Sequence, residues 1–196
     1  MADTEHTSFD NLYAHLTSTY GYPVLPSASA KPHDKKISHS ISSLSLHPTL
    51  ESILHLVNSD LPSAHFLCRH MQNKPAWEGM YIHGILHRIE GDYRNAEAWY
   101  GDVATSDCFK HVWSNGVDDA KAFIQGVEKL RKEKMGELAD LEQQSKHEMD
   151  ALVEWCKGQF GTGELQDATK AWVEPTEEHR KMAAKMLVGG EGWRQF

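Results

Sequence analysis

The stretch "ILHRIEGDYRNA" (residues 85–96) decides the fold, because it repeats an earlier phrase of the chain. The segment "ILHLVNSDLPSA" (residues 53–64) stands 32 residues before it and has Ile, Leu, His, Asp and Ala at the same places. In each copy, apolar residues at helical spacing lead to an aspartate that can cap a second helix. Each copy therefore predicts a helix, a short turn and a capped helix, and two copies in succession predict stacked helical hairpins.

The rest of the chain carries helical signals and no strand pattern. Two longer helices are predicted after the repeats, one starting near Asp118 and one from Leu138 to near Gly161. The alternation of apolar and polar residues that is typical of half-buried strands is absent. We therefore predict one all-α domain over residues 47–188, in which two helical hairpins (47–106) pack against long C-terminal helices (117–188).

The two ends of the chain are predicted to be less regular than its centre. Residues 1–46 are interpreted as an N-terminal arm with a loose tail (1–7), a short helix (Phe9–Leu16) and an extended or mobile segment (Tyr22–Leu46) rich in Pro, Ser and Lys. Thr176 can cap a last helix, Glu177–Leu187, and a Gly-rich tail (189–196) follows it.

Composition and charge exclude several classes of function. A hydrophobic fraction of 40% in 196 residues is enough for one packed core, and the net charge of −8 disfavours nucleic acid and anionic membrane surfaces as partners. No apolar run approaches the length of a membrane span, and the first ten residues, MADTEHTSFD, lack the apolar core of a signal peptide. Three widely spaced cysteines fit a reducing compartment, so we expect a cytoplasmic location.

The second repeat resembles a tetratricopeptide (TPR) repeat. Gly84, Gly91, Ala96 and Tyr100 stand where that family places its small residues, its turn and its packing residues. The period of 32 residues differs from the family's usual length of about 34, and only two copies are present. Because solenoids usually need three or more repeats, the resemblance implies a compact bundle closed by the later helices rather than an open superhelix.

A longer polar pattern resembles an uncharacterised family of fungal and bacterial proteins. Its segment HRIEGD (residues 87–92) is most similar to the fungal members. The pattern is AH, then HxxxHRxExDxxN, then an aromatic pair, and it is carried by these residues: His65, His83, His87, Arg88, Glu90, Asp92, Asn95, Trp99 and Tyr100. The resemblance implies a helical fold with a polar signature, and no established reaction comes with it.

The histidines of the repeats are the candidate site residues. His83 and His87 are four residues apart, so both project from one helix face, and Glu51 and His55 hold the corresponding positions of the first repeat. Neighbouring helices in such repeats lie about 10 Å apart, so we expect the two pairs to face one another. His65, on the intervening helix, is expected to point into the same space.

These groups predict a metal site. Imidazole and carboxylate groups on facing helices suit a divalent ion such as Zn, Fe or Mn, and the predicted ligands are Glu51, His55, His65, His83 and His87. In an enzyme, His83 or His87 would serve as a metal ligand or general base, Arg88 would hold an anionic group of a small polar substrate, and Glu90 could pair with Arg88. Hydrolysis, elimination and isomerisation all stay open.

Two alternatives remain beside the metal site. A TPR-like fold also suits an adaptor whose helical groove binds a peptide or partner protein without catalysis. The histidines can also be structural, since a chain with 13 histidines contains chance pairs at this spacing. A closed pocket around the histidines favours an enzyme, whereas a wide concave face favours an adaptor.

Overall fold

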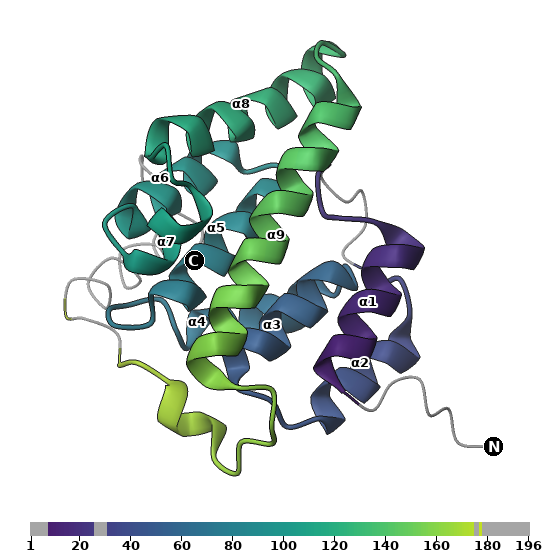
Figure 1. Cartoon of the computed structure of the whole chain (residues 1–196), viewed down its shortest axis with the longest axis vertical. Helices are drawn as coiled ribbons and strands as arrows, with labels where there is room; N and C mark the ends of the chain where they lie inside the picture. Colours follow the sequence, from purple (N-terminus) through teal and green to yellow (C-terminus); the bar gives the residue numbers. More distant parts are fainter. Residues whose placement is uncertain (1–7, 26–30, 175–176, 178–196) are drawn as a thin grey trace, which may run out of the picture.

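The structure is a computed structural model that describes residues 8–25, 31–174 and 177. Three predicted segments lie outside the described residues: the loose tail (1–7), the last helix beyond its first residue (178–187) and the Gly-rich tail (189–196). Nine α-helices and one 3-10 turn make up the regular structure of the described part, which contains no strand, so the predicted all-α fold is confirmed (Figure 1).

The helices follow one another through short connections. Their bounds are α1 Phe9–Tyr20, α2 Lys35–Ser43, α3 Pro48–Val57, α4 Leu61–Arg69, α5 Trp77–Glu90, α6 Tyr93–Val103, α7 Asp107–Val112, α8 Val117–Glu133 and α9 Leu138–Phe160, and the 3-10 turn is Ala168–Ala171. None of these described helices is both long and apolar enough to cross a lipid bilayer.

The sequence repeat forms two successive helix pairs. Helix α3 packs against α4 and α5 packs against α6, while α4 and α3 both contact α5. The same cap starts the second helix of each pair, since Asp60 accepts the Ser63 amide at 3.4 Å and Asp92 accepts the Asn95 amide at 3.3 Å. Gly91 ends α5 in the left-handed conformation, with φ of 87°, which a glycine adopts without a steric cost.

Helices α5 and α6 approach closely at Gly84. A Cβ atom at this position would lie 2.8 Å from Cδ1 of Tyr100 and 3.0 Å from Cβ of Trp99. Both aromatic side chains are buried, so they have little room to move away. The glycine therefore allows an interhelical distance that a larger residue would widen.

The C-terminal helices complete the bundle. Helix α9 packs against α3, α7 and α8, and it runs along the whole molecule beside the repeats (Figure 1). Between α6 and α8 the chain forms the short helix α7. Ser106 caps α7 by accepting the Phe109 amide at 3.1 Å, and burial of Cys108, Phe109 and Val112 holds the helix against the core.

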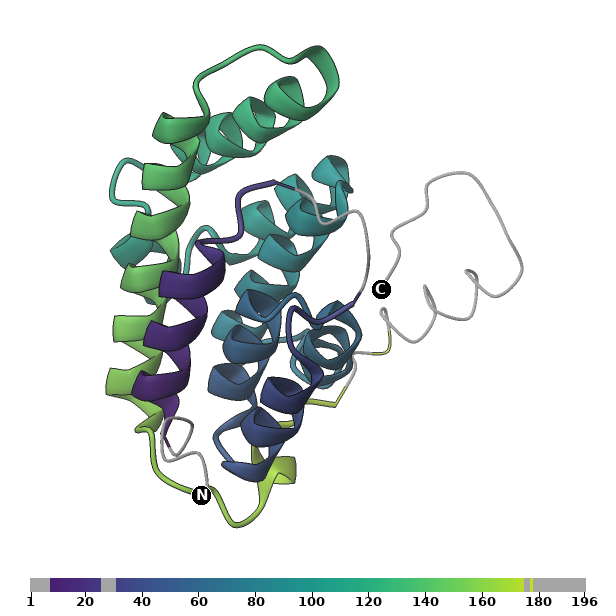
Figure 2. The same cartoon turned by 90° about the vertical axis from the view of Figure 1, so that its right-hand side faces the viewer.

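The N-terminal region is more regular than predicted. Helix α1 continues beyond Leu16 to Tyr20, and the segment interpreted as extended or mobile contains the helix α2. Asp34 caps α2, and Ile37 and Ile41 are buried against the core at the spacing of one helical turn. Both helices pack on α3, and α1 also lies beside α9, where Tyr13 donates a hydrogen bond of 3.1 Å to Asp150 (Figure 2). Pro32 precedes α2 and Pro48 follows it, and neither proline interrupts the capped helix between them.

Candidate functional site

Three imidazoles from two helices gather at one place, which we call the histidine cluster (His65, His83 and His87). Helix α4 carries His65, and α5 carries His83 and His87 one turn apart. One ring nitrogen of each histidine can be chosen so that all three lie within 4.8 Å of one another. The ring of His65 stands almost perpendicular to the other two, at centroid distances of 5.0 and 5.3 Å, while His83 and His87 stack at 4.8 Å. The cluster thus unites three of the five predicted metal ligands.

His83 is the most enclosed member of the cluster. Its side chain is fully buried, the indole of Trp99 stacks on it at 4.7 Å, and neither ring nitrogen has a hydrogen-bond partner in the described structure. Burial lowers the pKa of His83 well below its usual value of 6.5, and the nearby His87, His65 and Arg69 lower it further. The ring is therefore neutral at pH 7 and keeps a nitrogen lone pair, which is the form that binds a metal.

Glu90, the last residue of α5, lies at the exposed edge of the cluster. Its carboxylate is 3.2 Å from Nε2 of His65 and 3.4 Å from Nδ1 of His87. Partial burial raises the pKa of Glu90, but the hydrogen bonds with His65 and His87 outweigh burial and lower the pKa to about 2. The group is thus a carboxylate at neutral pH. The expected pairing of Glu90 with Arg88 is wrong, because Glu90 turns to the histidines.

Asn95 contacts the cluster from α6. Its side-chain amide nitrogen lies 3.3 Å from Nε2 of His87, on the side of the ring away from Glu90. Glu90 and Asn95 together fix the plane of the His87 ring, and Asn95 is buried. The cluster therefore has polar support from the second helix of its own repeat, as metal-binding histidines usually have.

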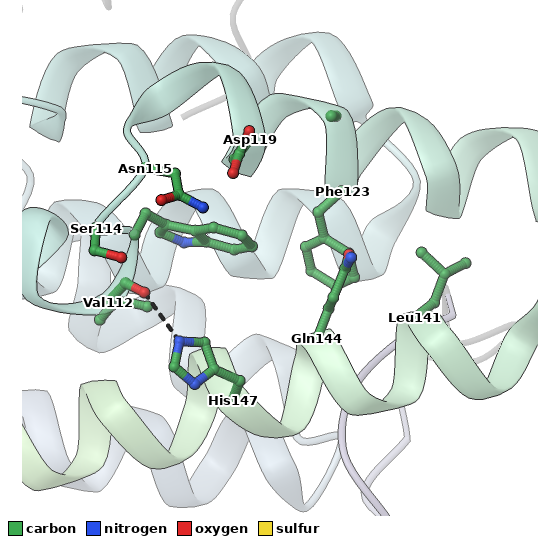
Figure 3. A pocket seen from close by; sticks show the side chains of 10 residues that line it. Val112, Ser114, Asn115, Asp119, Phe123, Leu141, Gln144 and His147 are labelled. Atoms are coloured by element: carbon green, nitrogen blue, oxygen red, sulfur yellow. Dashed lines mark hydrogen bonds between the residues drawn. The ribbon is translucent and has the colours of Figure 1, made fainter.

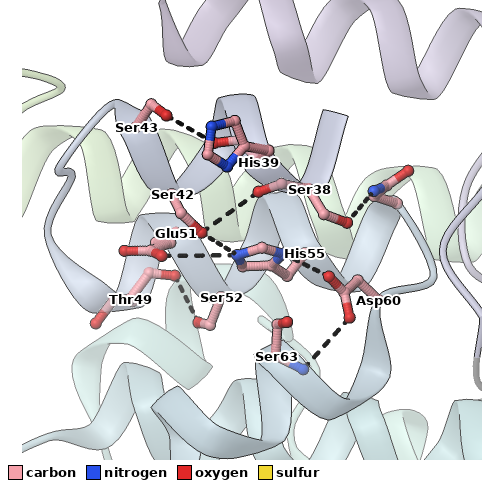
Figure 4. Close-up of polar contacts among 11 residues, drawn as sticks. Ser38, His39, Ser42, Ser43, Thr49, Glu51, Ser52, His55, Asp60 and Ser63 are labelled. Atoms are coloured by element: carbon pink, nitrogen blue, oxygen red, sulfur yellow. Dashed lines mark hydrogen bonds and ion pairs between the residues drawn. The ribbon is translucent and has the colours of Figure 1, made fainter. Parts of the chain in front are cut away.

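Glu51 and His55 belong to a separate network on α3 (Figure 4). Nε2 of His55 lies 3.6 Å from Glu51 and 3.5 Å from the hydroxyl of Ser42, while Nδ1 lies 3.2 Å from Asp60. Asp60 caps α4 and contacts His55 from there, so the imidazole contacts only its own helix pair and α2 in this network. The expectation that these two residues share one site with His83 and His87 is therefore corrected: they are not part of the cluster.

Arg88 faces the core instead of the cluster. The side chain is fully buried, and Nη1 donates to Glu148 at 2.6 Å and to the hydroxyl of Tyr100 at 2.9 Å. Successive residues of an α-helix point about 100° apart, so the residue after His87 reaches a different face of α5. The prediction that Arg88 holds an anionic substrate group is wrong, because its charge is already paired inside the protein.

Glu148 and Tyr81 also belong to this buried network, and neither was predicted from the sequence. Glu148 accepts hydrogen bonds from the hydroxyls of Tyr81, at 3.0 Å, and Tyr100. Burial raises the pKa of both tyrosines well above the usual value of 10.0, so both remain protonated donors. The one signal in the sequence is that Glu148 interrupts the apolar face of α9 between Leu141 and Leu152, where a carboxylate needs a partner.

A cavity of about 500 Å³ lies elsewhere in the molecule, between α8, α9 and the loop after α7 (Figure 3). Polar side chains line it, including Asn115, Asp119 and Gln144, and His147 lies 3.2 Å from the carbonyl oxygen of Val112. These residues come from other elements than the histidine cluster. The cavity is therefore a second polar feature, separate from the histidine cluster.

The chain matches no known family model, no curated protein and no solved structure. The resemblance to tetratricopeptide repeats and the polar signature thus stay predictions from the sequence. What the protein can do is inferred from its side-chain geometry, in which the histidine cluster is the arrangement best suited to chemistry.

Proposed function

We propose that this protein binds one divalent transition-metal ion, such as zinc, iron or manganese, through His65, His83 and His87. The observation that carries the proposal is the convergence of three imidazoles, one of them fully buried with both ring nitrogens unpaired. A buried polar group without a hydrogen bond costs about 1–3 kcal/mol, and a metal ion would use this lone pair. Imidazole nitrogen is also a common ligand for such ions.

The geometry needs a moderate adjustment to hold an ion. Nitrogen ligands about 2.0–2.1 Å from a tetrahedral zinc ion lie roughly 3.3 Å from one another. The ring nitrogens of the cluster lie within 4.8 Å, so the most distant pair would draw together by roughly 1.5 Å. His65 is the member free to move, because its side chain keeps 14% of its surface exposed and it stands on a short helix.

Glu90 and Asn95 support the proposal from outside the three nitrogens. The carboxylate of Glu90 faces both His65 and His87 and offsets part of the positive charge that an ion brings. A half-turn of the Asn95 amide would present its oxygen to Nε2–H of His87, which leaves Nδ1 with the lone pair on the side of Glu90. A metal-binding histidine commonly donates its second N–H to such an acceptor.

The test is a metal titration of the full-length protein after removal of metals with a chelator. We expect one Zn²⁺ or Co²⁺ per chain in calorimetry and in elemental analysis after dialysis. The variants His83→Ala and His65→Gln should lose at least tenfold in affinity. His65→Gln serves as the gentler change, because this side chain lies at the rim and its loss leaves no buried cavity.

The matched control is His39→Gln, which removes an exposed imidazole outside the cluster. This variant should bind the metal as the wild type does, and all variants should keep the far-UV circular dichroism of a helical protein. Equal affinity in the wild type and in the His65→Gln and His83→Ala variants would refute the proposed site. A chain that binds no metal would favour the adaptor interpretation.

A further inference from the structure

Arg69 brings a positive charge beside the histidine cluster. It follows His65 by four residues on α4, so both side chains project from the same face of that helix. Arg69 is exposed, and its side chain has no hydrogen-bond or ion-pair partner among the residues that the structure describes. Side chains four residues apart on a helix are neighbours, with Cβ atoms about 5–6 Å apart, so the guanidinium of Arg69 lies next to His65. A guanidinium within electrostatic range of the cluster is therefore available to a ligand.

The cluster reaches the protein surface at His65, one helical turn before Arg69 on α4. His83 is completely buried, whereas the side chains of His65 and Glu90 keep 14% and 35% of their surface exposed. Three imidazoles also fill only three positions of a tetrahedral ion. Structural zinc sites are closed by four protein ligands, while sites with three protein ligands keep a position for water or substrate.

The charges favour an anion at this position. A divalent ion brings two positive charges to three neutral imidazoles, Glu90 removes one of them, and Arg69 adds another. The occupied site would therefore attract a negative group. The planar guanidinium of arginine matches the two oxygens of a carboxylate or phosphate, with which it forms paired hydrogen bonds.

We infer that the metal keeps an exchangeable coordination position on the side of Arg69 and binds there an oxyanion of a small ligand, a carboxylate or a phosphate, which Arg69 contacts at the same time. This inference rests on the proposed metal site. It assigns to Arg69 the role that the sequence pattern had suggested for Arg88, and it names the chemical class of the ligand.

The experiment uses the full-length protein loaded with one equivalent of Co²⁺, whose visible absorption reports its ligands. Sodium acetate and inorganic phosphate are added separately at constant ionic strength. We expect a saturable change in the cobalt bands with at least one of the two anions, and the apparent affinity for that anion should fall about tenfold in Arg69→Gln. The matched control, Arg131→Gln, removes another exposed arginine and should behave as the wild type.

The possible outcomes separate this inference from the proposed function. If Co²⁺ binds stoichiometrically and neither anion changes its spectrum, the coordination shell is closed and the inference is wrong, while the metal site stands. An anion response that is equally strong in Arg69→Gln would remove Arg69 from the ligand site. If Co²⁺ does not bind, both the metal site and the inference fail.

Glu90 is the residue that could close the fourth position instead. In that case Glu90→Gln should alter the cobalt spectrum before any anion is added and should create an anion response that the wild type lacks. If the position is open as inferred, the wild type responds to the anion, and Glu90→Gln responds at lower anion concentration because one negative charge has been removed.

Discussion

Arg88 and Glu148 form a fully buried ion pair, with Nη1 and Oε2 2.6 Å apart, that joins the second helix pair to α9. Arg88 directly follows His87 in the chain, so neighbouring residues of α5 serve two different structures. One contributes to the histidine cluster, and the other connects α5 to a helix 60 residues further along the chain. Helix α5 is buried on most of its faces, which is why both of its polar faces need partners.

Breaking this ion pair should destabilise the protein strongly. Glu148→Gln leaves the guanidinium of Arg88 without its counter-charge in a buried place, and we expect a loss of about 3–5 kcal/mol in the free energy of unfolding. Urea unfolding followed by circular dichroism measures this. Glu154→Gln, which removes an exposed carboxylate from the same helix, is the control and should change the stability by less than about 0.5 kcal/mol. A Glu148→Gln variant as stable as this control would contradict the structural role of the pair.

Gly84 should not tolerate even a methyl group. Alanine is favoured over glycine in helices by about 1 kcal/mol, but its Cβ would lie 2.8 Å from the ring of Tyr100. We expect Gly84→Ala to destabilise the protein by about 1–3 kcal/mol because overpacking outweighs helix propensity. At Gly158 in α9 an added Cβ meets nothing within 4 Å, so Gly158→Ala should instead stabilise it by about 0.5–1 kcal/mol. Thermal unfolding measures both effects. If Gly84→Ala and Gly158→Ala shift the melting temperature in the same direction, α5 and α6 do not approach each other as described.

The N-terminal helices should contribute to stability like the rest of the core. Leu12 on α1 is fully buried, and Leu12→Ala should cost about 2–5 kcal/mol. The neighbouring Asn11 is exposed, so Asn11→Ala should be nearly neutral. Chemical denaturation of both variants tests this. If Leu12→Ala is as stable as the wild type, α1 contributes little to the stability of the core.

Stability should depend on pH through His83 when no metal is bound. The pKa of His83 is lowered in the folded state from 6.5, so below about pH 6.5 the unfolded chain binds a proton that the folded chain excludes. The free energy of unfolding should therefore fall as the pH is lowered from 7 to 5. The groups around this ring are His65, His87, Arg69 and Glu90, and among them only the carboxylate of Glu90 favours the charged ring.

The measurement compares urea unfolding curves at several pH values in the presence of a chelator. His83→Phe should be less sensitive to pH in this range, because phenylalanine fills the space without a proton to bind. His39→Gln should keep the slope of the wild type, since that imidazole is exposed. Equal slopes in the wild type and His83→Phe would show that His83 is not the group responsible.

The local features of this protein could be predicted from its sequence. Asp60 and Asp92 cap the second helices of the two repeats, Gly91 ends α5, and the spacing of His83 and His87 puts both on one face. Each of these depends on residues within about one helical turn, which is the range over which caps and periodicity act. Helix α2 was missed for the complementary reason: its short run of apolar residues, Ile37 and Ile41, is helical because it is buried against the core.

The partners of the polar side chains were decided by the tertiary structure. The repeat relates His55 to His87 in the sequence, yet His55 turns to Asp60 while His87 meets His65 and Glu90. The residues next to Arg88 in the sequence do not show whether its side chain faces solvent or the core. Its partner, Glu148, lies on α9, 60 residues further along the chain. A helix's sequence fixes which residues share a face, but the direction of that face depends on how the helix is rotated about its axis when all its neighbours pack. That rotation is set by contacts between residues far apart in the chain, and so the histidine cluster itself is a property of the assembled bundle.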